Sequence, residues 1–168
     1  MENYIMLEGN KIPLTDEQVK MLRDSKKPEK IEKSPFERMD SNSTYFYIDD
    51  CGIVEEENVN CYLEDQYRHK VANYCTDKSL MIQRALHETL NRLLWRFSME
   101  NGEGENLWNC CNTHYKIYWS YDLASFNISC NVTVKSPTSI YFPTKEIANK
   151  AIDEIVIPFM EANPDFVY

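Results

Sequence analysis

The chain has 168 residues, of which 43% are apolar and 12% aromatic, so it can bury a core and is not disordered throughout. Its formal net charge of −9 disfavours direct binding of nucleic acid, which requires a basic surface. No segment approaches the ~20 apolar residues of a membrane span, and the first residues lack the basic and apolar regions of a signal peptide. We therefore expect a cytoplasmic protein that does not contact a membrane.

The first 25 residues predict a β-hairpin followed by a short helix. Apolar residues alternate on both sides of a Gly-Asn turn at residues 8–11. Thr15 and Gln18 then fit a capping box at the start of a helix. A charged, proline-containing connector follows at residues 26–37. We therefore expect an appendage at residues 1–25 and a separate domain at residues 38–168.

The domain opens with a hairpin pattern and continues with a long helix. Residues 44–48, Thr-Tyr-Phe-Tyr-Ile, predict a strand, and residues 53–56 its return. Residues 62–74 have no clear period. Apolar side chains recur at helical spacing over residues 77–99, with Leu90 and Leu94 in the middle of the stripe and Trp95 widening it.

The last third of the chain predicts three strands and a second helix. The strands are expected at residues 115–120, 126–134 and 139–142, and the helix around Ile147 to Ile155, where Pro158 kinks or ends it. Strands and helices are segregated along the sequence. We therefore expect an α+β fold, with a mainly antiparallel sheet packed against one long and one shorter helix.

Six short motifs together resemble a known group of proteins. They are L-T-D-E-Q-V-K (residues 14–20), S-P-F-E-R (34–38), Y-F-Y-I-D (45–49), N-Y (73–74), K-I-Y-W-S-Y-D (116–122) and I-Y-F-P-T-K-E-I-A-N-K-A-I (140–152). The combination resembles small, mostly uncharacterised phage and mobile-element proteins of Gram-positive bacteria. The resemblance supplies no catalytic residues. It implies an accessory protein of the bacterial cytoplasm, such as an anti-CRISPR or other anti-defence inhibitor.

The segment from residue 40 to residue 67 contains eight acids and neither Lys nor Arg. Its sharpest cluster comprises Asp49, Asp50, Glu55, Glu56, Glu57, Glu64 and Asp65. These carboxylates could imitate phosphates and occupy the basic groove of a nuclease. They could instead form a solvated strand edge that blocks strand addition. A third interpretation, a magnesium-dependent nuclease site, lacks a nearby Lys and any positive charge for the substrate.

An aromatic run around Trp119 is the second candidate surface. Alternation along a strand would place Tyr115, Ile117 and Trp119 on one face, as sheet core or as an interface hot spot. The string Cys110-Cys111-x-x-His114 is a weak zinc pattern, because no second local pair completes it. No nucleotide-binding or hydrolase motif is present, so we expect no catalytic residue, no metal and no cofactor.

The favoured interpretation is a non-enzymatic inhibitor of phage origin. Its partner is expected to be a bacterial defence nuclease, with a CRISPR effector favoured over a restriction enzyme because of its large basic groove. The alternatives are an oligomeric structural or regulatory mobile-element protein without a defence target and, third, a metal-dependent nuclease. Homo-oligomerisation is left open.

Overall fold

The computed structural model describes residues 4–7, 10–25, 34–60, 62–109 and 111–168. The chain divides into two compact units, Met1–Ser34 and Pro35–Tyr168. Most of the expected connector, at residues 26–33, lies outside the described residues. So does the expected turn at residues 8 and 9.

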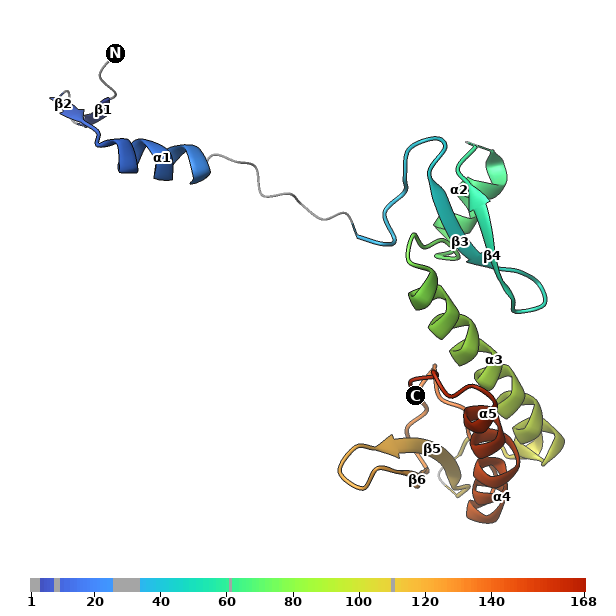
Figure 1. The fold of residues 1–168 in the computed structure, drawn as a ribbon. Coiled ribbons are helices and arrows are strands. Elements are labelled where there is room, and N and C mark those ends of the chain that lie inside the picture. The colour runs from blue at the N-terminus through green and yellow to red at the C-terminus, as the bar shows by residue number, and fades with distance from the viewer. Residues whose placement is uncertain (1–3, 8–9, 26–33, 61, 110) are drawn as a thin grey trace. The chain divides into compact units, whose positions relative to one another are not determined.

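The N-terminal unit contains the expected hairpin and helix (Figure 1). Strands β1 (Tyr4–Leu7) and β2 (Asn10–Pro13) are antiparallel and precede helix α1 (Asp16–Ser25). The capping box forms as predicted. The Thr15 amide donates to Gln18 Oε1 at 3.0 Å, and the Gln18 amide donates to Thr15 Oγ1 at 3.3 Å. The backbone amides of Thr15 and Gln18 thereby find hydrogen-bond acceptors within the segment itself, without tertiary contacts.

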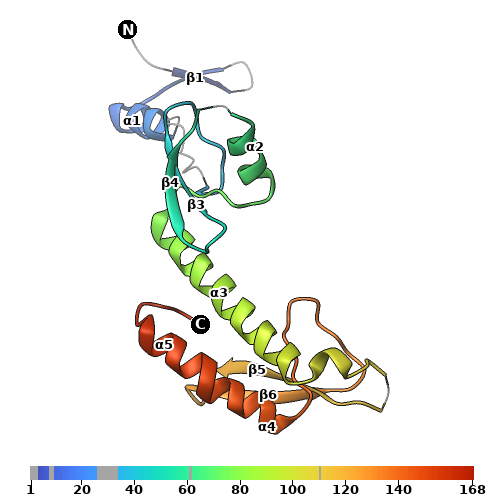
Figure 2. The same cartoon turned by 90° about the vertical axis from the view of Figure 1, so that its right-hand side faces the viewer.

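The larger unit is built along one helix, α3 (Lys78–Glu100) (Figures 1 and 2). The Asp77 carboxylate caps it by accepting from the amides of Ser79 and Leu80. Leu90 and Leu94 are buried, as expected from the apolar stripe. Trp95, however, is 59% exposed and does not widen the buried face, because it lies beside the stripe rather than on it.

A first hairpin packs on the N-terminal half of α3. Strands β3 (Thr44–Ile48) and β4 (Val54–Asn58) are antiparallel, and helix α2 (Leu63–Lys70) follows them. Their core with α3 consists of Ile48, Cys75, Met81 and Ala85. An isolated bridge from Phe46 to Cys75 covers the second edge of β3. In the part of the chain that the structure describes, β4 pairs only with β3, so its outer edge is open.

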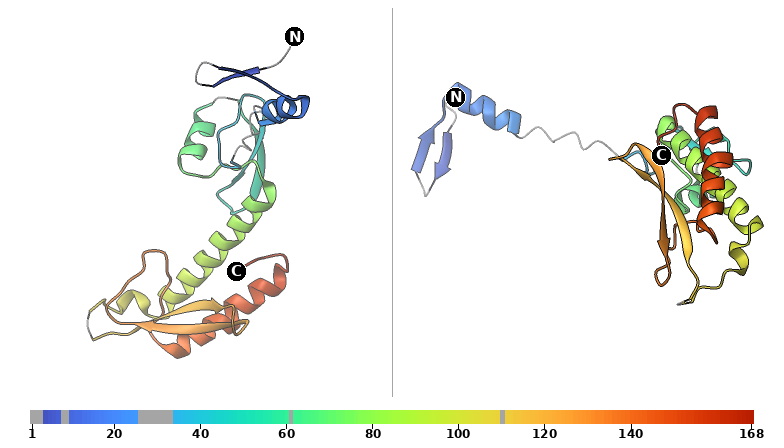
Figure 3. Two further views of the ribbon diagram at one scale, coloured as in Figure 1. Left: turned by 90° about the vertical axis from the view of Figure 1, so that its left-hand side faces the viewer. Right: turned by 90° about the horizontal axis from the view of Figure 1, so that it is seen from below.

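A second hairpin packs on the C-terminal half of α3 (Figure 3). Strands β5 (His114–Ser120) and β6 (Ser125–Asn131) are antiparallel. The third strand expected here, at residues 139–142, is reduced to a single bridge between Tyr115 and Phe142. The main core cluster joins Leu90, Leu94 and Phe97 of α3 to Phe142 and to the last helical segment.

The last helical segment continues through its proline. Helix α4 (Lys145–Ala151) passes into a π-helical turn (Ile152–Val156) and then into α5 (Ile157–Ala162). Pro158 therefore does not end the helix. It sits in the first turn after the π-helical residues, where the missing N–H is tolerated because the regular ladder is already interrupted.

The α+β class and the antiparallel pairing are confirmed, but the strands form three separate two-stranded sheets. The reason is the length of α3. A helix of 23 residues extends about 35 Å at 1.5 Å per residue, so hairpins on its two halves cannot pair with each other.

Candidate functional site

The three consecutive glutamates of β4 lie on two faces of the first hairpin. Glu55 is opposite Tyr47 and Glu57 opposite Tyr45, whereas Glu56 is opposite Phe46. Directly opposed residues share a face. Glu55 and Glu57 therefore lie on the face that carries α2, and Glu56 on the face that packs toward α3. The three residues do not form one continuous acidic surface.

The two aspartates of the β3–β4 turn have different roles. Asp49 Oδ1 accepts from the amides of Cys51 and Ile53, at 2.9 and 2.7 Å, and so holds the turn together. Gly52 in the same turn has φ of +86°, and a Cβ atom there would meet Thr89 Oγ1 of α3 at 3.4 Å. Asp50 is exposed. Only Asp50 of this pair is free to face a partner.

Asp65 is buried, with 3% of its surface exposed, so the expectation that it faces a partner is wrong. It accepts from the Tyr45 hydroxyl at 2.7 Å and from the Asn60 amide at 2.9 Å. Burial by itself would raise the pKa of Asp65, but these donors and the nearby Arg68 charge outweigh it and hold the pKa below its usual value. Asp65 is a structural acid that fixes α2 to β3.

Arg68 completes this network from the next turn of α2. Its Nη1 donates to the Tyr45 hydroxyl at 2.6 Å, and its guanidinium carbon lies 3.6 Å from the centre of the Tyr47 ring. Burial, followed by the hydrogen bond to Asp65, raises the pKa of Tyr45 to about 12. Arg68 also interacts electrostatically with Glu57, but its hydrogen bond goes to Tyr45 and, within the described residues, it forms no salt bridge with a surface glutamate.

The surface acids gather around two depressions. Glu57 and Glu64 line one of about 410 Å³ together with Tyr62 and the Asp65–Arg68 pair. Asp49 and Asp50 line another of about 440 Å³, where Arg84 and Arg92 also lie. Those two arginines bind Glu88, at 2.8 and 3.2 Å. Both depressions therefore contain charges of both signs. They differ because, within the described residues, Glu57 and Glu64 form no salt bridge, whereas the two arginines of the second depression are paired with Glu88.

Trp119 lies on the second hairpin, away from the acidic residues (Figure 1). It is half-buried and packs edge to face on Phe126, with ring centres 4.8 Å apart. Ile117 on the same face belongs to the core, as alternation predicted. The most exposed large apolar side chains of this hairpin are at its tip, where Tyr121 is 81% and Leu123 67% exposed. The predicted acidic and aromatic residues are not parts of one site.

A buried cluster around His114 escaped the sequence analysis. His114 is fully buried and its Nδ1 lies 2.5 Å from Glu103 Oε1. The Trp108 ring stacks on the imidazole at 3.7 Å, and Tyr141 meets Trp108 edge to face. No solvent reaches the imidazole, so the pair closes the loop before β5 rather than offering a general base to a substrate. Its trace in the sequence, the Cys-Cys-x-x-His string, is a weak zinc pattern and did not indicate a buried His–Glu pair.

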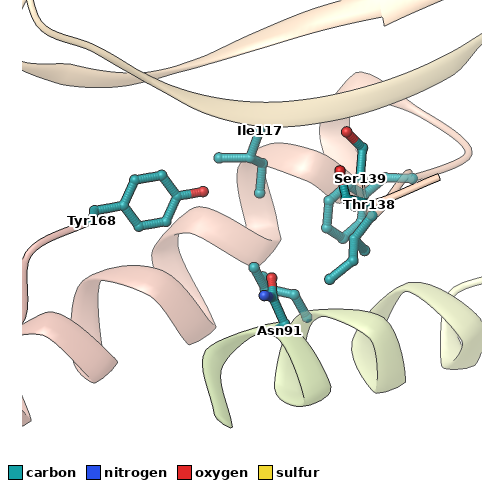
Figure 4. A pocket seen from close by; sticks show the side chains of 8 residues that line it. Asn91, Ile117, Thr138, Ser139 and Tyr168 are labelled. Atoms are coloured by element: carbon teal, nitrogen blue, oxygen red, sulfur yellow. The ribbon is translucent and has the colours of Figure 1, made fainter. Parts of the chain in front are cut away.

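A small cavity of about 190 Å³ lies between α3, β5 and the residues that precede α4 (Figure 4). It is lined by Asn91, Leu94, Ile117, Thr138, Ser139, Ile140, Phe142 and Tyr168. The lining combines an apolar floor with neutral polar groups. The cavity could not be predicted from the sequence, because its lining residues come from four separate segments.

Searches for related proteins are negative: no family model, curated protein or solved structure matches this chain. Within the described residues, no group of His, Cys, Asp and Glu is arranged to hold a metal ion. Among the helices that the structure describes, none has the length and apolar character needed to cross a membrane.

Proposed function

We propose that the protein is a non-enzymatic inhibitor of phage or mobile-element origin that acts in the bacterial cytoplasm by binding a host defence nuclease. The observation that carries this proposal is the unpaired negative charge on the first hairpin and α2. We call it the acidic group, and it comprises Glu55 and Glu57 on the hairpin face that carries α2, together with Glu64 of α2. Within the described part of the chain, none of these three side chains forms a salt bridge.

Three features favour a docking role for the acidic group. Arg68, which lines the same depression as Glu57 and Glu64, donates to Tyr45. The charges are carried by a hairpin and a helix that are tied together by the buried Asp65, so they are held in place before binding. Glu55 and Glu57 are about 6.8 Å apart along one strand, since each residue advances ~3.4 Å, and they form a linear array.

A nuclease that accommodates guide and target strands presents a large basic channel, which attracts such an array. An acidic edge strand also has a simpler role, because charge on an open edge prevents pairing with other chains. Both roles can coexist. They differ in one respect: edge protection concerns the open edge of β4 alone, whereas docking also requires Glu64 on α2.

The deciding experiment measures inhibition of DNA cleavage by a purified RNA-guided nuclease and by a restriction endonuclease. The test variant combines Glu57→Lys and Glu64→Lys, which line the same depression. The matched control combines Glu105→Lys and Glu161→Lys, two exposed acids elsewhere. The control changes the net charge by the same amount, so it accounts for general electrostatic effects.

We expect the wild type and the control to inhibit one of the nucleases and the test variant to lose at least ten-fold in association rate, the lower end expected for lost electrostatic steering. Inhibition should also weaken with salt, because attraction is screened over ~10 Å at 0.1 M. A test variant that folds and inhibits at full strength would falsify the docking role of this depression.

The exposed tip of the second hairpin favours the alternative, an oligomeric regulatory protein. Tyr118, Tyr121 and Leu123 expose apolar surface there without a covering element in the described residues. Sedimentation equilibrium of the wild type and of a Tyr121→Ser, Leu123→Ser variant distinguishes the two functions. Self-association that disappears in the variant, together with no inhibition of either nuclease, would make the oligomeric protein the better conclusion.

A further inference from the structure

Four polar side chains line the small cavity beside α3 (Figure 4). They are Asn91 on α3, Thr138 and Ser139 on the segment before α4, and Tyr168. Among the described residues, the structure gives none of these four side chains a hydrogen-bond partner. Several uncommitted donors and acceptors around one cavity are typical of a ligand site.

The arrangement of these groups is convergent. In Figure 4 the Tyr168 hydroxyl points toward the cavity from one side, the Asn91 amide lies below it, and Thr138 and Ser139 lie opposite Tyr168. Between them the wall is apolar and includes Ile117. A molecule in this space would contact the apolar side chains of this wall, but most of the lining surface that it met would be polar.

The lining contains no Asp, Glu, Lys, Arg or His. An ion placed here would lose hydration without gaining a charged partner, which is strongly unfavourable. Burial raises the pKa of the Tyr168 phenol, so the hydroxyl stays protonated and can donate at neutral pH. The volume of about 190 Å³ is below the roughly 300–1,000 Å³ of sites for drug-sized molecules. The ligand is therefore small and uncharged.

We propose that this cavity binds a small uncharged organic molecule that has an apolar body and carries a hydrogen-bond donor and acceptor, such as a primary amide. The proposal is independent of nuclease inhibition, because no residue of the acidic group lines the cavity.

One side chain of α3, Gln83, hydrogen-bonds the backbone of the segment that carries Tyr168 at two points. Gln83 Nε2 donates to the Asp165 carbonyl at 2.7 Å, and Gln83 Oε1 accepts from the Val167 amide at 3.0 Å. Phe166, between them, is buried and meets the His87 ring edge to face at 4.7 Å. Gln83 thus fixes the backbone on both sides of an anchored phenylalanine, and this positions Tyr168 at the cavity.

The test compares benzamide with benzoate, which have the same shape but differ in charge. Each is titrated into the isotopically labelled full chain, and binding is followed by amide and methyl NMR shifts. We expect benzamide to bind with a Kd on the order of 1 mM, reasonable for a ligand of this size, and to shift the Ile117 and Leu94 methyl signals. We expect at least ten-fold weaker binding of benzoate.

Two substitutions on α3 make the test specific. Asn91→Leu removes one amide from the cavity, and Asn91 is exposed, so folding should be unaffected. It should weaken benzamide binding about three- to ten-fold, as expected for one hydrogen bond. Arg96→Leu, an exposed control on the same helix that does not line the cavity, should leave the Kd unchanged.

Gln83→Ala tests the anchoring of the last segment. It should weaken binding and broaden the signals of Val167 and Tyr168, whereas Arg96→Leu should do neither. Three outcomes would overturn the proposal: no shift at these methyls with benzamide up to its solubility limit, equal binding of benzoate, or equal losses in the Asn91 variant and the Arg96 control.

Discussion

Replacing Tyr45 by Phe should destabilise the larger unit although it removes a single oxygen atom. The hydroxyl joins two charged groups: it donates to Asp65 at 2.7 Å and accepts from Arg68 at 2.6 Å. The ring itself would remain, stacked on Tyr74 with centres 4.4 Å apart. The substitution therefore separates the polar network from the apolar packing.

The expected loss follows from the exposure of the two partners. Asp65 is 3% exposed, so it cannot regain a water molecule easily when its hydroxyl donor is removed. Arg68 is half-buried and can be rehydrated. Hydrogen bonds to charged groups contribute about 1.5–3 kcal/mol each, and only the bond to Asp65 is lost without replacement. We expect the free energy of unfolding to fall by about 1.5–3 kcal/mol.

Urea denaturation at neutral pH measures this loss: the midpoint should fall, while the m value should stay unchanged. Tyr47→Phe is the matched control, since within the described residues the Tyr47 hydroxyl has no hydrogen bond, and it should cost under about 0.5 kcal/mol. A double-mutant cycle with Asp65→Ala should give a coupling energy above about 1 kcal/mol. Additive effects, or a Tyr45→Phe loss no larger than the control, would refute the reasoning.

Three further predictions concern stability. Leu90→Ala and Leu94→Ala, both at buried positions, should each lower the free energy of unfolding by about 2–5 kcal/mol in thermal melts. Ile82→Ala is the control: Ile82 is 40% exposed, and its loss should be under about 1 kcal/mol. Equal losses at all three positions would mean that the buried face is misassigned. A raised pKa favours the protonated phenol in the folded state, so the stability due to Tyr45 should be lost as the pH rises from 10 toward about 12. The lowered pKa of Asp65 acts in the opposite direction: its contribution is present above the unfolded pKa near 3.8 and is lost as the pH falls below it. Urea midpoints of wild type and Tyr45→Phe should therefore converge at both extremes of pH, and a constant difference would contradict the assignment. Pro158→Ala should change the free energy of unfolding by under ~1 kcal/mol, far less than the ~3 kcal/mol that a proline typically costs inside a regular helix. A calorimetric gain of ~3 kcal/mol in this variant would contradict the role of the π-helical turn.

The candidate site was only partly predictable. Local composition identified the acidic segment, and Asp50, Glu55, Glu56 and Glu64 are exposed as a surface role requires. It could not separate them from Asp49, which holds a turn, because both kinds of aspartate look alike in sequence. It also treated the β4 glutamates as one cluster. Once the strand is assigned, alternation alone divides them between two faces.

Short-range patterns determined most of the secondary structure, except helix α2 and the segment at residues 139–142, which forms only a bridge. Caps at Thr15 and Asp77 set where two helices begin, and the apolar stripe through Leu90 sets which face of its helix is buried. Each of these signals acts over only a few residues. The same holds for the strand at residues 44–48, whose aromatic and β-branched side chains suit a pleated, half-buried surface.

The tertiary structure decided the rest through contacts between distant residues. Asp65 is buried because a hydroxyl 20 positions away donates to it, and Tyr168 reaches the cavity because Gln83 binds Val167 across 84 positions. The length of α3 keeps the two hairpins apart, so the strands that pattern alone assigned to one sheet form separate ones. Periodicity records which face of an element is apolar, but it does not record which element covers that face. Which element covers an apolar face depends on packing and on the pairing of buried polar groups, and these contacts form only when the chain folds.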